Sequence, residues 1–260
     1  MQANPRTRAQ EKIRDVLNII GKFGFSSPEN ITLASRAAMR GYGERLHEAG
    51  FLTKREVSGL VVGGKAVSKI YGLSQKGADL TGCDPVDIWK ISAGRMAHTL
   101  IAQRIVIEGF KKNIIPCAGL AVDFRVEAYG SGIHFRPDVT LQCQGLMDDG
   151  NNVVVYLEVE LSGKSGGELD RFYAKLNRSM CLVHFESPQL MHRYICKLGE
   201  FVIKEELPKW FRRADGNYIP DGTLPFDELD LSGVYFQTLD NQYGVEDLVL
   251  EQRHLKSYAF

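Results

Sequence analysis

The first third of the chain combines helical periodicity with a hairpin signal. The apolar residues of segment 8–23 recur three or four positions apart, as on the buried face of an α-helix: Ile13, Val16, Leu17, Ile20 and Phe23. A short segment around Ile31 and Leu33 precedes a second helical pattern, in which Ala38, Tyr42, Leu46 and Ala49 are the apolar positions. Residues 53–80 then predict two strands joined by Gly63-Gly64, a dipeptide typical of β-hairpins.

The middle of the chain changes to a period of two. Residues 81–91 contain Gly and Pro without periodicity and predict a linker, and residues 93–112 predict a helix. Apolar and polar residues then alternate in three segments, 120–128, 133–143 and 153–161, which predict half-buried strands in a meander. An amphipathic helix from about residue 166 and a short apolar strand at 181–186 follow. This strand–helix–strand unit favours a right-handed crossover with parallel pairing.

Charge is distributed unevenly along a chain whose net charge is zero. Residues 1–80 carry 13 Lys and Arg against 7 Asp and Glu, a net charge of +6. Residues 216–260 carry 2 against 8, a net charge of −6. A local basic patch matters more for nucleic-acid binding than the overall balance, so the N-terminal third is the expected contact region.

Cysteine usage and hydropathy exclude several classes of protein. The five cysteines are scattered, odd in number and never spaced as C-x-x-C, which argues against a zinc site and a disulfide framework. No apolar run approaches the length of a membrane helix, and the N-terminus lacks the apolar core of a signal peptide. We therefore expect a cytoplasmic protein with no membrane segment.

Three carboxylates are expected to converge in the hairpin formed by residues 133–161. Asp138 falls opposite Glu158 or Glu160 if the turn centres near Asp148, and the two glutamates share one strand face. Such a cluster would protonate or destabilise the sheet unless a cation offsets it. Oxygen ligands of this kind suit Mg²⁺ or Mn²⁺. The alternative is an exposed polar face on which Arg136, Lys164 or Lys175 forms ion pairs.

The N-terminal third resembles a winged helix-turn-helix in the phrase "RLHEAGFLTKRE…SKIYGLSQKGADL". The resemblance implies binding to double-stranded DNA, with the second helix of the pair in the major groove and the hairpin on the backbone. The residues expected on the DNA side are Arg36, Arg40, Arg45, Lys54, Arg55, Lys65 and Lys69. Basic residues on a surface helix can also be merely solvated, and winged helices also serve as protein-contact modules.

The phrase "PDVTL…VVVYLEVELSGK" resembles the P-D…(D/E)-x-K core of restriction-endonuclease-like nucleases. The resemblance implies that Asp138 and Glu158 bind metal and that Glu108, on the preceding helix, is an additional acidic ligand. Glu160 occupies the position of the family's lysine, where it would support the metal or orient water. Lys175 is then the preferred source of the missing amine, and Lys164 is the other candidate.

Both halves together are similar to the replication-relaxation family and to MobC-type relaxases of mobilisable plasmids. The similarity implies an α/β (α+β) protein: a winged helix at 1–82, an αβββαβ nuclease-like domain at 92–215 and an acidic extension at 216–260. It implies metal-dependent nicking at an origin-like duplex site, contact with single-stranded DNA and association with other mobilisation proteins. The alternatives are a non-catalytic DNA-binding accessory factor or repressor with a degenerate nuclease fold, and a restriction-type enzyme that cuts both strands.

Overall fold

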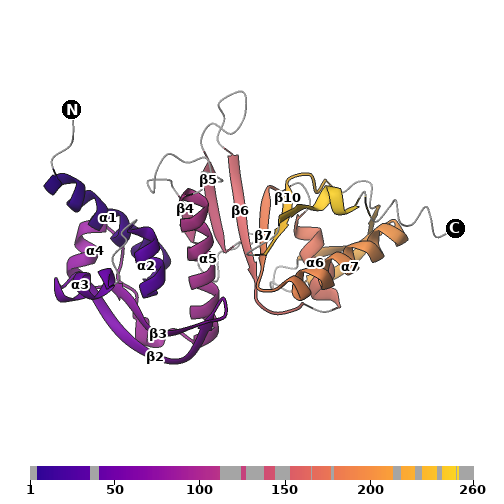
Figure 1. The fold of residues 1–260 in the computed structure, drawn as a ribbon. Coiled ribbons are helices and arrows are strands. Elements are labelled where there is room, and N and C mark those ends of the chain that lie inside the picture. The colour runs from indigo at the N-terminus through magenta and orange to yellow at the C-terminus, as the bar shows by residue number, and fades with distance from the viewer. Residues whose placement is uncertain are drawn as a thin grey trace. The chain divides into compact units, whose positions relative to one another are not determined.

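In a computed structural model of the chain, the parts that the structure describes are residues 5–35, 41–111, 124–126, 138–143, 153–164, 166–176, 179–212, 218–225, 230–238, 242–249 and 251. The chain divides into two compact units, which are described separately below (Figure 1). The first comprises Met1–Val126 with Gln142–Val153, and the second comprises Glu127–Leu141 with Val154–Phe260. Both combine helices with sheet, so the α/β class expected from the sequence is confirmed.

The N-terminal unit combines helices with a small antiparallel sheet of strand order β1-β3-β2. Its elements are α1 (Pro5–Phe23), β1 (Phe25–Ser26), α2 (Pro28–Ala34), α3 (Tyr42–Glu48), β2 (Leu52–Val62), β3 (Lys65–Leu73), α4 (Gln75–Thr81), a 3₁₀ turn η1 (Ile88–Lys90), α5 (Ala93–Lys111) and β4 (Phe124–Val126). Gly63 and Gly64 both have positive φ, which lets them form the tight turn between β2 and β3. The predicted hairpin is therefore confirmed.

Side-chain caps explain where the short helices α2 and α4 begin. The Ser27 hydroxyl accepts a hydrogen bond from the backbone N–H of Asn30, and Pro28 occupies the first turn of α2. The Ser74 hydroxyl caps α4 in the same way by accepting from Gly77 N–H. These caps satisfy backbone donors that would otherwise lack a partner within the helix.

A buried polar network attaches helix α5 to the start of the N-terminal unit. The side-chain oxygen of Gln103 accepts hydrogen bonds from Ser26 Oγ at 2.7 Å and from Asn30 Nδ2 at 2.9 Å. The Gln103 amide nitrogen donates to the carbonyl oxygen of Phe25 at 3.1 Å, and Asn30 Nδ2 also donates to the carbonyl oxygen of Leu100 at 2.9 Å. Gln103 is fully buried, so these bonds replace water completely and fix the position of α5 along its axis.

The second unit is built on a mixed sheet in which five strands follow the order β11-β10-β7-β6-β5. Its elements are β5 (Val139–Cys143), β6 (Val153–Glu160), α6 (Gly167–Leu176), β7 (Cys181–Phe185), α7 (Pro188–Lys204), β8 (Glu206–Arg212), β9 (Tyr218–Pro225), β10 (Val234–Gln237) and β11 (Gln242–Gly244). Strands β6, β7 and β10 run parallel, and β11 is antiparallel to β10. The predicted parallel crossover from β6 through α6 to β7 is confirmed.

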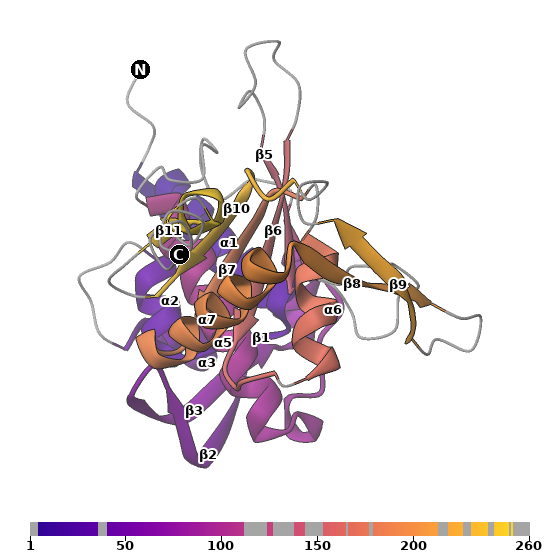
Figure 2. The ribbon, with the colours of Figure 1, turned by 90° about the vertical axis from the view of Figure 1, so that its right-hand side faces the viewer.

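Helices α6 and α7 cover one face of this sheet (Figures 1 and 2). The apolar stripe predicted on α6 is buried in the core that the helices form with the sheet: Leu169, Phe172, Tyr173 and Leu176. Strands β8 and β9 form a separate antiparallel hairpin that the sequence patterns did not predict. Residues assigned to an acidic extension supply strand β10, whose Val234 and Phe236 are fully buried in the same core.

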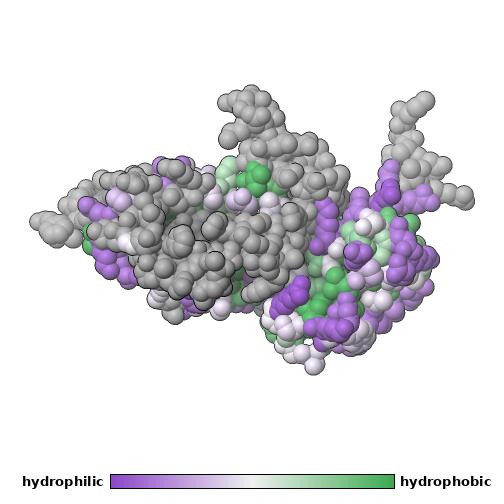
Figure 3. Space-filling model, turned by 180° about the vertical axis from the view of Figure 1, so that it is seen from behind, coloured by the Kyte–Doolittle hydropathy of each residue, from purple (hydrophilic) through white to green (hydrophobic). Residues whose placement is uncertain are grey.

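Within the described residues, no helix is long and apolar enough to cross a membrane. The space-filling view from behind shows hydrophilic and hydrophobic areas side by side on the described surface of the N-terminal unit (Figure 3).

Candidate functional site

The two glutamates of β6 lie on the face of the sheet that the helices cover. Glu158 pairs in register with Val183 and Glu160 with Phe185, and residues paired in this way share a face. Val183 and Phe185 belong to the core formed with α6 and α7. The polar face expected from the sequence is therefore a largely apolar layer into which carboxylates are inserted.

Glu160 is buried, with 4% of its surface exposed, and has two partners at the end of β6. Its Oε1 forms an ion pair with the ammonium of Lys164, four residues further along the chain. Its Oε2 accepts a hydrogen bond from the hydroxyl of Tyr194 on α7 at 3.0 Å. The Tyr194 oxygen also accepts from the backbone N–H of Lys164 at 3.3 Å, so Tyr194 ties the loop after β6 to α7.

Asp138 sits at the start of β5 and is bound to the backbone of β6. Its N–H donates to the carbonyl oxygen of Leu157 at 2.8 Å, and its Oδ2 accepts from the N–H of Val159 at 2.7 Å. These two bonds bracket Glu158. A carboxylate held by a strand N–H can serve as a structural cap or present its other oxygen to a ligand.

The pKa of Asp138 reflects its burial and its charged surroundings. Burial raises the pKa of the Asp138 carboxyl to about 7, against the opposing effects of the Val159 N–H and the charge of Lys164. Burial also raises the pKa of the Cys181 thiol, and the charges of Glu158 and Asp138 raise it further.

The residues present fit a hard divalent cation held by two carboxylates. Among the described residues, no group of three or more His, Cys, Asp or Glu is placed to hold a metal ion. Mg²⁺ and Mn²⁺ often bind through one or two carboxylates and keep water or phosphate oxygens in the other positions. Burial makes the ionised form of Asp138 costly, and a bound cation would offset that cost.

Two residues expected in this site, Lys175 and Glu108, are not among the contacts described above. The side chain of Lys175 lies outside the described residues, although its backbone belongs to α6, so its catalytic role stays a prediction. Glu108 belongs to α5 in the N-terminal unit, where its Oε1 accepts from Arg104 Nε at 2.8 Å. Its role as a metal ligand also stays a prediction.

Two of the basic residues expected to face DNA, Arg36 and Arg40, lie outside the described residues. The other five divide into three groups. Arg45 and Lys65 are exposed. The Arg55 guanidinium donates to the carbonyl oxygens of Ile88 at 2.5 Å and Ile91 at 3.1 Å, which commits it to the η1 segment.

Lys54 and Lys69 form the third group, because both contact the carboxylate of Glu44 on α3. The distance from Lys69 Nζ to Glu44 Oε1 is 2.5 Å, and that from Lys54 Nζ to Glu44 Oε2 is 3.4 Å. Glu44 therefore pairs with two of the lysines that were predicted to contact DNA.

Tyr194 and Arg193 were not singled out from the sequence. A Cβ added to Gly163 would lie 2.6 Å from a guanidinium nitrogen of Arg193, so the absence of a side chain at Gly163 admits this arginine beside the loop after β6. The sequence signal for this approach is the glycine itself, since a lone glycine next to a strand often marks a close contact. Tyr194 has no comparable signal, because it lies 34 residues from its partner Glu160.

Comparison of the chain with protein-family models, with curated proteins and with solved structures gave no match. Function is therefore inferred from the geometry and chemistry of the two units.

Proposed function

We propose that the protein nicks DNA in a metal-dependent reaction, with the N-terminal unit binding the duplex and the second unit cleaving one strand. The observation that carries this proposal is that Asp138 hydrogen-bonds to β6 on either side of Glu158, beside the end of the strand where Lys164 pairs with Glu160. This combination suits phosphodiester hydrolysis, because carboxylates bind metal and an ammonium stabilises negative charge on phosphate.

The N-terminal unit supports duplex binding through its architecture. Helices α1 to α3 followed by the β2–β3 hairpin have the order of a winged helix-turn-helix. Arg45 on α3 and Lys65 at the hairpin turn are exposed and are the described residues best suited to contact phosphates. The net charge of +6 over residues 1–80 favours the same partner.

The second unit supports cleavage through a nuclease-like arrangement. Strands β5 and β6 followed by α6 and β7 match the order expected of a restriction-endonuclease-like core. Asp138 and Glu158 would hold Mg²⁺ or Mn²⁺, which supplies water activation and charge neutralisation at the phosphate. Glu160 accepts a hydrogen bond from Tyr194 and pairs with Lys164, which holds the Lys164 side chain in place. The Lys164 ammonium would then take the role of the lysine in the nuclease family.

Lys164, the other candidate from the sequence, is the amine whose side chain is described at the end of β6. Its ammonium contacts Glu160 and influences the Asp138 carboxyl, so it lies among the proposed site residues. Arginine at this position would keep the charge but not the shape of the ammonium. Lys164→Arg is therefore expected to keep the ion pair with Glu160 while lowering the nicking rate.

A second candidate function is a DNA-binding protein without catalysis. It is favoured by the pairing of Lys164 with buried Glu160, which is also what a purely structural ion pair would show. It is favoured further by the lack, among the described residues, of a group of three metal-ligating side chains.

The test incubates the purified full chain with supercoiled plasmid that carries candidate origin sequences, in the presence of Mn²⁺ or Mg²⁺. The proposal predicts open circles that EDTA abolishes. Duplex binding without any conversion would favour the non-catalytic function, and linear product would favour a restriction-type enzyme.

A further inference from the structure

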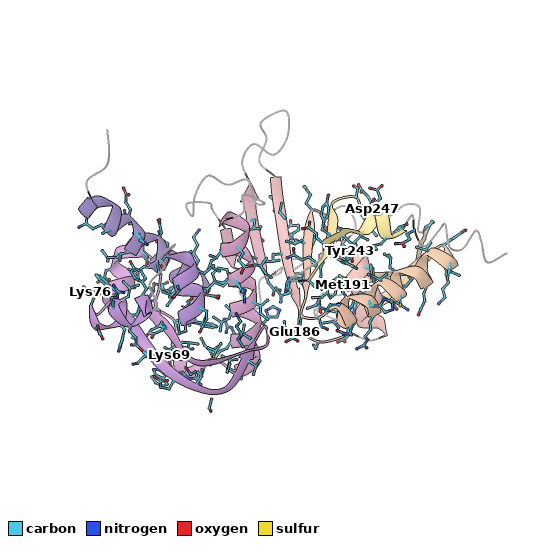
Figure 4. The ribbon with its side chains drawn as sticks, viewed as in Figure 1. Lys69, Lys76, Glu186, Met191, Tyr243 and Asp247 are labelled. Atoms are coloured by element: carbon cyan, nitrogen blue, oxygen red, sulfur yellow. The ribbon has the colours of Figure 1, made fainter. Side chains whose placement is uncertain are left out.

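Glu44 is the centre of a charged cluster that joins three elements of the N-terminal unit. Its two carboxylate oxygens contact Lys69 on β3 and Lys54 on β2, at 2.5 and 3.4 Å. The hydroxyl of Tyr71 on β3 also helps to lower the pKa of Glu44. Figure 4 labels Lys69 on the hairpin, where it projects from the strand that precedes α4. The cluster thus links α3 to both strands of the proposed wing.

The surroundings of this cluster are acidic rather than basic. Glu56 pairs in register with Lys69, and the charges of Glu56 and Glu29 also act on the Lys69 ammonium. Two lysines therefore face three carboxylates. A phosphate approaching this part of the unit would meet no excess of positive charge, although the sequence counts both lysines as DNA contacts.

Glu44 stays paired with the two lysines at neutral pH, and all three side chains remain accessible to a ligand. The hydrogen bond from Lys69 lowers the pKa of Glu44 to about 2, helped by the hydroxyl of Tyr71, so the carboxylate is ionised throughout the neutral range. The side chains of Glu44, Lys54 and Lys69 are 31%, 31% and 30% exposed. A phosphate oxygen could therefore replace the carboxylate as the partner of either lysine.

We propose that Glu44 limits the affinity of the N-terminal unit for duplex DNA by occupying Lys54 and Lys69. The inference rests on the proposed duplex binding. Sequence-independent affinity comes mainly from phosphate contacts, so lysines already neutralised by Glu44 add little to it. The remaining contacts, including Arg45 and Lys65, then carry a larger share of the binding.

The test measures the affinity of the full chain for a short duplex of arbitrary sequence at several salt concentrations, by fluorescence anisotropy. Glu44→Gln keeps the size of the side chain and an acceptor for the Tyr71 hydroxyl but removes the charge. Glu48→Gln is the matched control, because it removes the same charge from an exposed position on the same helix.

For Glu44→Gln, the slope of log affinity against log salt should become more negative by about 1.8, since each of two new phosphate contacts adds about 0.9. Glu48→Gln should change it by well under 0.9. Adding Lys54→Ala and Lys69→Ala to Glu44→Gln should return the slope to the wild-type value.

The outcomes separate this inference from the proposed function. If the wild type binds the duplex and Glu44→Gln has the same slope, the inference is overturned while duplex binding stands. The inference is also overturned if the steeper slope of Glu44→Gln remains after Lys54→Ala and Lys69→Ala are added. If neither protein binds the duplex at low salt, the inference and the proposed duplex binding both fail.

Discussion

The Glu160 carboxylate shows how much a single residue depends on its partners. It is buried in an apolar layer, where an ionised carboxylate is tolerated only if it is paired and hydrogen-bonded. Lys164 supplies the charge and Tyr194 the hydrogen bond. Burial in turn raises the pKa of the Tyr194 hydroxyl to about 12, so it remains a donor to Glu160 at neutral pH.

Removing the charge of Lys164 should therefore destabilise the second unit. We expect Lys164→Ala to lower the free energy of unfolding by about 1–3 kcal/mol, because it leaves the Glu160 carboxylate without its cation. Adding Glu160→Gln should recover much of this loss. Urea denaturation of the two single variants and the double variant measures the coupling between the two positions.

Lys204→Ala, at an exposed position on α7, is the control for loss of a lysine and should change the free energy of unfolding by less than about 0.5 kcal/mol. Strictly additive effects of Lys164→Ala and Glu160→Gln would show that the two side chains do not interact in solution.

The carboxyl of Glu44 predicts a specific loss of stability in acid. Its pKa is lowered from 4.5 to about 2 in the folded chain, first by the hydrogen bond from Lys69. A lowered pKa means that the contribution is fully present above pH 4.5 and is lost as the pH falls through about 2. The groups that act on it are Lys54, Lys69 and the Tyr71 hydroxyl, and the charges of Glu29 and Glu56 act in turn on Lys69 and Tyr71.

The measurement compares the thermal midpoints of the wild type and Glu44→Gln over the acidic range. The advantage of the wild type should be largest above pH 4.5 and should shrink toward pH 2. A difference in midpoint that stays constant with pH would mean that the ionised carboxylate contributes nothing to folding.

At the scale of elements, α5 is held to the N-terminal unit by polar groups as well as by apolar packing. Met96 and Leu100 pack into a core with Phe25 and residues of the hairpin. Gln103 adds hydrogen bonds to Phe25 and Ser26 of β1 and to Asn30 of α2. Apolar packing is not directional, whereas the hydrogen bonds of the Gln103 side chain require one particular position of the helix.

We expect Gln103→Met to lower the free energy of unfolding by about 2 kcal/mol or more, because it leaves the carbonyl of Phe25 and the polar groups of Ser26 and Asn30 buried without their partner. The control is Gln75→Met at an exposed position on α4, which should change it by less than about 0.5 kcal/mol. Thermal and urea unfolding of both variants provide the comparison. Equal stability of Gln103→Met and the wild type would contradict the role given to the network.

Local patterns were sufficient for the elements whose signal lies within a few residues. Two such features are the Gly63-Gly64 turn and the buried stripe of Leu169, Phe172 and Leu176. Each was predictable because a turn with positive φ and a helical period are both determined by residues close together in the sequence. The parallel pairing of β6 and β7 followed from the crossover rule.

Tertiary context decided what the sequence left open. A period of two assigns Glu158 and Glu160 to one face, but it does not say that helices cover this face or that Tyr194 supplies a hydroxyl from α7. Likewise, a count of basic residues includes Lys54 and Lys69 but not the carboxylate of Glu44 between them.

Charge composition was a poor guide to the end of the chain for a similar reason. Residues 216–260 have a net charge of −6, which suggested an extension, yet Val234 and Phe236 are buried on β10. Strand β10 pairs in parallel with β7, so this part of the chain completes the sheet that carries the candidate site.

At the scale of the whole molecule, the account assigns recognition to one unit and chemistry to the other. A variant that removes only the chemistry should leave the fold and duplex affinity unchanged. Asp138→Asn suits this purpose, because an amide oxygen can still accept the hydrogen bond from the Val159 N–H while the negative charge is lost. Asp138→Ala would lose both and cannot separate the two roles.

The most direct measurement of the central claim is therefore the initial rate at which the wild type and Asp138→Asn convert supercoiled plasmid to open circles with Mn²⁺. Duplex affinity and thermal midpoint are measured in parallel. The account predicts Mn²⁺-dependent nicking by the wild type and a loss of at least about 100-fold in Asp138→Asn, the scale expected when an essential electrostatic contact is removed, with binding and folding retained. Equal nicking by the two proteins, or none by a wild type that binds the duplex, would contradict it.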